Sequence, residues 1–310
     1  MISYLSKRFL FLIPLWIGIS IIGFIFIQLS PGDPAEILLQ KEGIEPTPEA
    51  IETMRSKLGL NDPPYIQYIR WLWKLIHMDI GVSYKTGEPV INELLNRLPA
   101  TLELTLVSFG FIVILSLMIG LLSALNKHGI FDRVGVLMAI MGASIPSFWL
   151  GLILIYLFSI KLRWFPIMGR GSVYHLVLPA LTLSFGTLIV QARLLRTSLQ
   201  EVLRKDFIMT ALAKGVSRKR ILIRHALPNA VLPLMTNLGL ILGRLLGGAV
   251  IVETIFAWPG IGRLAVESIL QRDYPVIQGY LLLTALIFVF INLCVDVGYR
   301  LIDPRIELDR

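Results

Sequence analysis

Residues 102–125 read LELTLVSFGFIVILSLMIGLLSAL, a run of 24 residues in which Glu103 is the one charged side chain. A helix needs about 20 mostly apolar residues to cross the hydrocarbon core of a bilayer. Because backbone groups in lipid must be hydrogen-bonded within their own segment, the run predicts a transmembrane helix. Five more segments approach this length, at 9–29, 134–160, 176–192, 231–255 and 279–302. The predicted fold is therefore all-α, a polytopic membrane protein with six transmembrane helices.

The composition of the whole chain agrees with a membrane protein. Of its 310 residues, 55 % are hydrophobic and 16 % are charged, whereas soluble domains average about 25 % charged residues. These values exclude a soluble enzyme and a disordered chain. Cys294 is the only cysteine, so an intramolecular disulfide scaffold is excluded as well.

The first apolar segment follows Lys7 and Arg8, which resembles the charged start of a signal peptide. It is longer than the apolar region of a signal peptide, and no Ala-x-Ala cleavage site follows it. We therefore expect a retained N-terminal transmembrane helix over 1–29. The expected organisation continues with an extracytoplasmic segment over 30–101, a five-helix core over 102–302 that includes a cytoplasmic loop at 193–228, and a cytoplasmic tail over 303–310.

The distribution of charge predicts the orientation of the chain. The formal net charge is +8, and the stretch 191–228 alone carries nine bases and two acids. The segment 30–101 carries ten acids and seven bases. Because loops rich in Lys and Arg stay in the cytoplasm, we expect 191–228 and both termini to be cytoplasmic in a multi-pass protein of the cell (inner) membrane. The three bases of one short loop oppose this orientation: Lys161, Arg163 and Arg170.

The extracytoplasmic segment shows signals for short helices. Residues 47–49 (Thr-Pro-Glu) predict a helix start and Gly59 its end. A second helix is expected after Asp62 and Pro63, and a third after the turn at 86–89. The second helix has an apolar face, which we expect to pack on the membrane spans, with a substrate site as the alternative. This face consists of Ile66, Ile69, Trp73 and Ile76.

The basic loop predicts two short helices separated by a glycine. The first covers 207–215 and ends at Gly215, and the second covers 218–226, with Ser217 as its cap. The second helix is expected to stop before Leu227 and Pro228. Positive-inside topology explains the charge of the loop, but it does not explain this ordered pattern of small residues and glycine.

This pattern resembles the EAA loop of ABC importer permeases. Residues 210–215 read Thr-Ala-Leu-Ala-Lys-Gly and are followed by Leu227-Pro228, although Met209 replaces the leading glutamate of the family. The peptide and nickel branch commonly departs in the same way. Further motifs of that branch occur in order along the chain, at 30–34 (SPGDP), 99–104 (PATLEL), 253–260 (ETIFAWPG), 272–278 (RDYPVIQ) and 303–305 (DPR). The chain resembles the first of two permease subunits in dipeptide, oligopeptide and nickel importers.

The resemblance implies a fold, partners and a coupling site. The fold would be that of a type I ABC importer permease, paired with a second and different permease. One or two ATP-binding subunits and an extracytoplasmic substrate-binding protein would complete the importer. The sequence contains no G-x-x-x-x-G-K-[ST] motif, so ATP and Mg would be bound by a partner, and this chain would be neither an enzyme nor a cofactor carrier. The residues expected to couple to the ATPase are Thr210, Ala211, Ala213, Lys214, Gly215, Leu227 and Pro228.

Charged residues within or near the spans are candidates for the translocation path. An Arg or Asp at a helix centre costs about 2.5–3.5 kcal/mol, and such residues usually face the protein interior or water. Arg244 is the deepest of them. It either lines the path and meets an anionic group, or it forms a structural ion pair or extends its long side chain to the membrane interface. Glu103 and Glu253 are expected within reach of headgroups and water, whereas Asp296 has Arg300 four residues later, which favours a local pair.

The sequence leaves the cargo open between nickel and short peptides. The four histidines are scattered, so no metal-binding residues are predicted in this chain. The short loop 161–175 and the stretch 256–260 look slightly more like the nickel or metallophore branch. A secondary transporter is the alternative function, but the internal repeats that it predicts are not evident. A membrane enzyme would need a catalytic cluster, which is also not evident.

Overall fold

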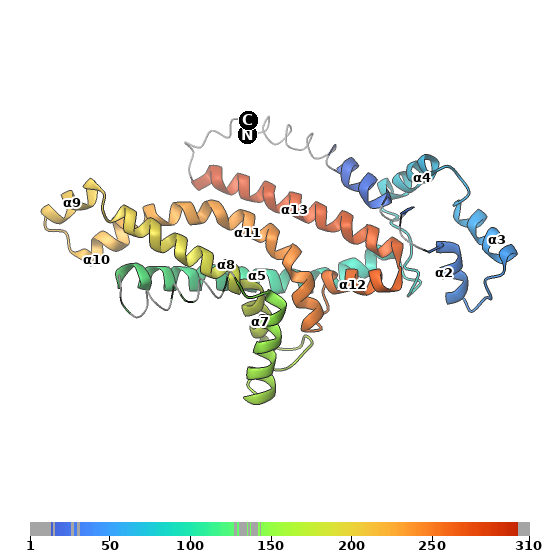
Figure 1. Cartoon of the computed structure of the whole chain (residues 1–310). Coiled ribbons are helices and arrows are strands. Elements are labelled where there is room, and N and C mark those ends of the chain that lie inside the picture. Colours follow the sequence, from blue (N-terminus) through green and yellow to red (C-terminus); the bar gives the residue numbers. More distant parts are fainter. Residues whose placement is uncertain are drawn as a thin grey trace. The chain divides into compact units, whose positions relative to one another are not determined.

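The computed structural model describes residues 14–302 except 15, 26–27, 30–31, 127–128, 130–134, 136, 138–141 and 143, and it leaves the side chains of 41, 236, 248 and 295–302 undescribed. Helices make up the architecture of this part (Figure 1). An isolated antiparallel bridge joins Val82 and Pro89. The expected all-α class is confirmed.

The chain forms two compact units, which we describe separately. The first unit (residues 1–99 and 260–289) contains α2 (Pro34–Lys41), α3 (Pro48–Leu58), α4 (Pro64–Ile76) and α12 (Ile261–Gln271). The second unit (100–259 and 290–310) contains α7 (Ser147–Leu154), η1 (Ile155–Lys161), α8 (Val173–Val202), α9 (Asp206–Ala213), α10 (Arg218–Ile221), η2 (Leu222–Ala226) and α11 (Leu227–Ile255). Two long helices contribute residues to both units: α5 (Val90–Leu125) and α13 (Tyr274–Ile302).

Three described helices are long and apolar enough to cross a membrane: α5, α8 and the stretch Tyr274–Cys294 of α13. A pair of helical pieces, Arg218–Met235 and Asn237–Gly247, forms a fourth candidate with a bend of 42°. The first and third expected spans lie partly outside the described residues, which contain the shorter apolar helices Trp16–Ile25 and Ser147–Lys161. The count of six spans and the domain boundaries therefore stay predictions.

The helix α5 corrects one expectation. We expected a short helix after residue 89 and a separate span from 102, whereas α5 runs without interruption from Val90 to Leu125. Pro99 inside it removes one backbone hydrogen bond. Leu94 and Leu104 are fully buried on either side of this proline. Each of the two leucines belongs to an apolar cluster, and such tertiary packing is not contained in local sequence signals.

The outer helices confirm the start and stop signals but not the expected packing. The Thr47 hydroxyl accepts a hydrogen bond from the Ala50 N–H, and Gly59 ends α3 with φ +69°. In α4, however, Ile69, Trp73 and Ile76 are 61, 66 and 67 % exposed. The opposite face of α4 is the one that packs, because the rings of Tyr68 and Trp71 contact the ring of Phe24.

A buried carboxylate anchors the loop that precedes α5. Asp273 accepts hydrogen bonds from the Ser83 hydroxyl at 2.5 Å, the Tyr84 N–H at 3.0 Å and the Lys85 N–H at 3.1 Å. Burial, together with the negative charge of Asp273, raises the pKa of the Tyr84 hydroxyl to about 12. Asp273, from the motif at 272–278, thus holds this loop within the first unit.

The core of the second unit is built by α7, α8 and α11, which pack against one another. Near one end, Trp258 and Phe256 are buried among apolar residues of α5, α8 and α11. Toward the other end, a second cluster includes Leu195, Leu199 and Ile208. The helices α9 and α10 lie beyond this second cluster, where α8 ends and α11 begins (Figure 1).

Candidate functional site

The expected coupling residues form a helix end of well-defined geometry. Gly215 follows α9 in the left-handed region with φ +77°. Its N–H donates to the Leu212 carbonyl at 2.9 Å, and the Val216 N–H donates to the Ala211 carbonyl at 3.2 Å. These two bonds define a Schellman motif, which needs a left-handed residue at the position of Gly215. Glycine is required here for its backbone, because no atom lies within 4 Å of an added Cβ.

The second helix of the basic loop differs from the expectation. We expected a helix capped by the Ser217 side chain and ending before Leu227, but that side chain makes no capping hydrogen bond. Instead, α10 passes through the π-helical η2 directly into α11. Pro228 is the second residue of α11, and because η2 continues directly into α11, the N–H that proline lacks removes one backbone hydrogen bond from this continuous helix. The wider turn of η2 joins the two helices without a loop.

The tip formed by α9 has a buried side that packs on α8 and an exposed side that carries apolar side chains. Ile208 and Ile221 are buried in the cluster with Leu195 and Leu199 of α8. Three large apolar residues of the tip are instead exposed: Phe207, Met209 and Leu212. Thr210, Ala213 and Lys214 are exposed as well, Ala211 and Leu227 are half-buried, and Pro228 is exposed. A small apolar patch among bases is a surface suited to a protein partner.

A polar cavity lies between α8 and α11 and contains Arg244. Its volume is about 350 Å³. Its lining combines four glycine or aliphatic positions on α8 and α11, one glycine that precedes α7, and four polar side chains; it comprises Gly142, Gly186, Thr187, Val190, Gln191, Asn237, Leu240, Ile241 and Arg244. Arg244, the deepest candidate from the sequence, is therefore placed at a cavity, together with Gln191 and Asn237, which the sequence analysis did not select.

The two glutamate candidates have different environments. Glu103 forms an ion pair with Arg170, with Nη2 and Oε2 at 2.6 Å, and both side chains are partly exposed. This pair gives Arg170, one of the three bases that opposed the predicted orientation, a partner in its own unit. Glu253 is 0 % exposed and accepts a hydrogen bond from the Thr101 hydroxyl at 2.6 Å. Our expectation that water reaches Glu253 was wrong.

The burial of Glu253 follows from the chain turn after α11. The Trp258 N–H donates to the Glu253 carbonyl at 2.8 Å, and the Trp258 indole N–H donates to the Ala100 carbonyl at 2.8 Å. The indole ring is fully buried and covers this end of α11. The structure thus brings together Glu253 and Thr101, but it places neither of them at the cavity of Arg244. Asp296 lies in α13, and its side chain is outside the described residues.

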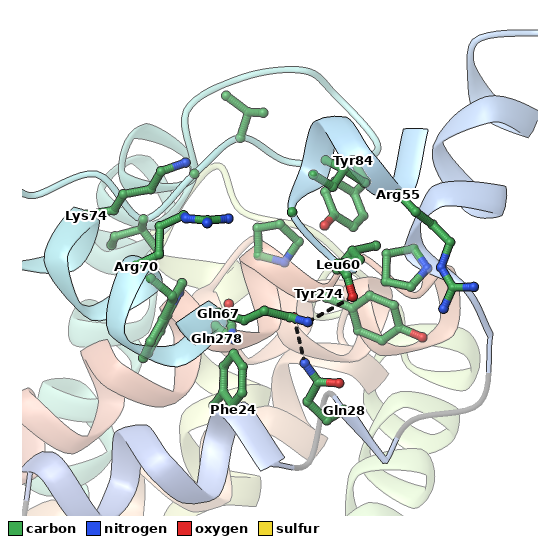
Figure 2. A pocket seen from close by; sticks show the side chains of 18 of the residues that line it. Phe24, Gln28, Arg55, Leu60, Gln67, Arg70, Lys74, Tyr84, Tyr274 and Gln278 are labelled. Carbon is green, nitrogen blue, oxygen red and sulfur yellow. Dashed lines mark hydrogen bonds between the residues drawn. The ribbon is translucent and has the colours of Figure 1, made fainter. Parts of the chain in front are cut away.

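The first unit contains a larger cavity of about 610 Å³, shown in Figure 2. Gln67 lies at its centre, where its Oε1 accepts from Gln28 and its Nε2 donates to the Leu60 carbonyl. Two of its three cations are paired, Arg55 with Asp33 at 3.4 Å and Arg70 with Asp62 at 2.6 Å. Because most of its charge is neutralised internally, this cavity offers less to a charged ligand than the cavity of Arg244.

Comparisons with known proteins match nearly the whole length of the chain. A family model described as "Binding-protein-dependent transport system inner membrane component" matches residues 116–308, and a model for the N-terminal part of such membrane components matches residues 1–105. The dipeptide transport system permease protein DppB of Alkalihalophilus pseudofirmus is 40 % identical, covering 99 % of this chain and 100 % of DppB. The glutathione transport system permease protein GsiC of Escherichia coli K12 is 42 % identical, covering 99 % of each chain.

A solved structure shows the same fold at lower identity. The MetNI methionine ABC transporter in an inward-facing conformation is similar with a TM-score of 0.60 and 21 % identity, covering 70 % of this chain and 100 % of that chain. The described helices thus have the arrangement of an ABC importer permease. At this identity the likeness concerns the fold alone.

Proposed function

The chain belongs to the family of binding-protein-dependent transport system inner membrane components, the permeases of ABC importers, and on this premise we propose how it works. It forms half of a translocation path, and a second, different permease forms the other half. A substrate-binding protein delivers the cargo on the extracytoplasmic side. ATP and its Mg ion are held by one or two partner subunits, and closure of those subunits reorients the spans.

The observation that carries the coupling proposal is the tip formed by α9. Its exposed residues Phe207, Met209 and Leu212 form an apolar contact surface, while Ile208 and Ile221 fix the tip to α8 and α11. A force applied to α9 is therefore transmitted to two long helices that pack directly on each other. This arrangement suits a contact that must move with the spans, and Thr210, Ala211, Ala213, Lys214, Gly215, Leu227 and Pro228 are its proposed residues.

We propose that the cargo is a short peptide of two or three residues. The support comes from the two relatives at 40 and 42 % identity, whose names assign them dipeptides and glutathione. The alignment with GsiC spans 307 residues, close to the chain's 310, whereas the alignment with DppB spans 335 and so contains gaps opposite this chain. The nickel preference favoured by the sequence finds no support among these relatives and stays a prediction.

Reconstitution separates an ABC importer from an ion-gradient transporter. We expect proteoliposomes with both permeases and the ATP-binding subunits to take up radiolabelled dialanine or glutathione only when ATP and loaded binding protein are both supplied. Vesicles that contain this chain alone, with an imposed proton or sodium gradient, serve as the control and should show no uptake.

Two results would contradict the proposal. Uptake by the chain alone on an ion gradient would identify a secondary transporter. ATP-driven uptake of nickel, free or chelated, without uptake of either peptide would keep the permease function and replace the cargo.

A further inference from the structure

The cavity between α8 and α11 is formed by one face of each helix. Gly186, Thr187, Val190 and Gln191 on α8 are separated by steps of one, three and one, and Asn237, Leu240, Ile241 and Arg244 on α11 by steps of three, one and three. Steps of three and four place residues on the same side of a helix. Because α8 and α11 pack together and run in opposite directions (Figure 1), Gln191 lies toward the Asn237 end and Gly186 toward the Arg244 end.

A buried acceptor without a donor lies at one end of this cavity. Gln191 is 4 % exposed, and its Oε1 has no hydrogen-bond partner among the described residues. Buried polar atoms are nearly always paired in native proteins, so an unpaired one calls for a missing partner. An N–H group of a ligand would supply the donor. Asn237, on the facing helix, adds a second amide beside it.

At the other end lies Arg244, an exposed cation without a counter-ion among the described side chains. Within the described part of the chain, no ion pair or hydrogen bond engages the side chain of Arg244. Arg244 lies near the middle of α11, whose other residues in this part are mostly apolar. Charged side chains at such depth normally face a partner or a water-filled path. The guanidinium group can bind a carboxylate through two parallel hydrogen bonds.

We propose that this cavity is a binding subsite for the carboxylate end of a short peptide during its passage through the membrane. Arg244 binds the terminal carboxylate, and the Gln191 amide oxygen accepts from the N–H or ammonium group at the other end. Asn237 and Thr187 contact the peptide bond between them. This subsite rests on the proposed transport of short peptides and identifies which chemical group of the cargo the chain recognises.

The dimensions of the cavity limit the length of the cargo. Asn237 and Arg244 are seven residues apart, which is about 10 Å along a helix at 1.5 Å per residue. An extended peptide covers about 3.3–3.6 Å per residue, so about three residues fill this distance and two cover about two thirds of it. The volume of about 350 Å³ is at the small end of ligand sites, which begin at about 300 Å³. Longer peptides would leave residues outside the subsite.

The first test replaces Arg244 in the complete importer, reconstituted with its partner chains in proteoliposomes and supplied with saturating binding protein. The probe is radiolabelled dialanine. We expect Arg244→Gln to lower the uptake rate at least tenfold, and Arg244→Lys, which keeps the positive charge, to retain at least a third of it. Equal uptake by Arg244→Gln and wild type, or equal loss in both variants, would overturn the subsite. Absence of uptake by the wild type would instead overturn the proposed function.

A second pair of variants keeps Arg244 and tests the subsite even if the Arg244→Gln chain does not form the importer complex. Leu240 precedes Arg244 by four residues, lines the cavity and is exposed in the single chain. Leu240→Glu places a carboxylate where it pairs with Arg244 along the helix and competes with the cargo. Leu240→Gln has nearly the same size without the charge. We expect uptake by Leu240→Glu to be at least fivefold slower than by Leu240→Gln, and equal rates would overturn the subsite.

Discussion

Gly215 shows how one backbone angle supports the coupling tip. Its φ of +77° is accessible to glycine, is tolerated by asparagine and is impossible for proline, whose φ is fixed near −65°. We therefore expect Gly215→Pro to abolish ATP-driven uptake while the chain still reaches the membrane, because the Schellman turn cannot form. Gly215→Asn should keep most of the activity. Uptake and membrane levels are measured together in reconstituted or whole-cell assays.

The control for this prediction is Gly215→Ala. No atom lies within 4 Å of the added Cβ, so this variant tests the backbone angle without a steric clash, at a cost of about 1–2 kcal/mol. We expect its activity to lie between those of the Asn and Pro variants. Normal uptake by Gly215→Pro would remove the turn from the coupling mechanism.

Tyr84 gives a prediction about pH. Burial and the neighbouring Asp273 raise the pKa of its hydroxyl to about 12, from the usual 10. The folded state holds this proton more tightly than the unfolded state. The contribution of Tyr84 to the free energy of unfolding is therefore complete below pH 10 and is lost as the pH rises from 10 toward 12. The check is the phenolate absorbance of wild type minus that of Tyr84→Phe, titrated in detergent. A midpoint near pH 10 would contradict the buried, Asp273-linked environment.

The close contact between α5 and α8 depends on a glycine. A Cβ on Gly120 would lie 2.8 Å from the Ala192 carbonyl oxygen and 2.9 Å from the Leu195 Cβ. Gly110 provides a matched control on the same helix, because nothing lies within 4 Å of its added Cβ. We expect Gly120→Ala to destabilise the protein by about 1–3 kcal/mol through overpacking. Gly110→Ala should be neutral or gain up to about 1 kcal/mol in helix propensity.

Thermal unfolding of the two variants in detergent measures this difference. A lower melting temperature for Gly120→Ala alone is the expected result. An equal effect of both substitutions would show that helix propensity, and not the α5–α8 contact, decides the stability.

The ends of helices were predictable from the sequence where capping residues, proline or glycine mark them locally. Thr47, Pro48 and Gly59 define both ends of α3, and the glycine after α9 was correctly read as a helix end. The continuity of α5 through Pro99 was not predictable, because a proline is a local signal for a helix boundary and the burial of the flanking residues is not visible in the sequence. Arg244 was found because a charge interrupts an apolar run, whereas Gln191 was missed because its amide carries no charge and the candidates were selected by charge. Its position at the cavity becomes evident only from the packing of α8 against α11.

The charge distribution makes a prediction about the orientation of the whole protein in the membrane. The segment 191–228 holds nine of the 29 basic residues against two acids, while 30–101 has an excess of acids. By the positive-inside rule, α9 and α10 face the cytoplasm, and α3 lies on the extracytoplasmic side. This orientation is also the one that lets the α9 tip meet a cytoplasmic ATPase and the outer helices meet a delivered cargo.

Cysteine labelling tests this orientation directly. The natural Cys294 is exposed and is first removed by Cys294→Ser. We expect Lys219→Cys, at an exposed position of α10, to react with a membrane-impermeant maleimide only after the membrane is opened. Ser56→Cys, at an exposed position of α3, should react in intact cells. The reverse pattern would place the basic loop outside, where no ATPase could reach it, and would remove the premise of the coupling mechanism. Labelling of both sites in intact cells would show that the chain does not separate them across a membrane.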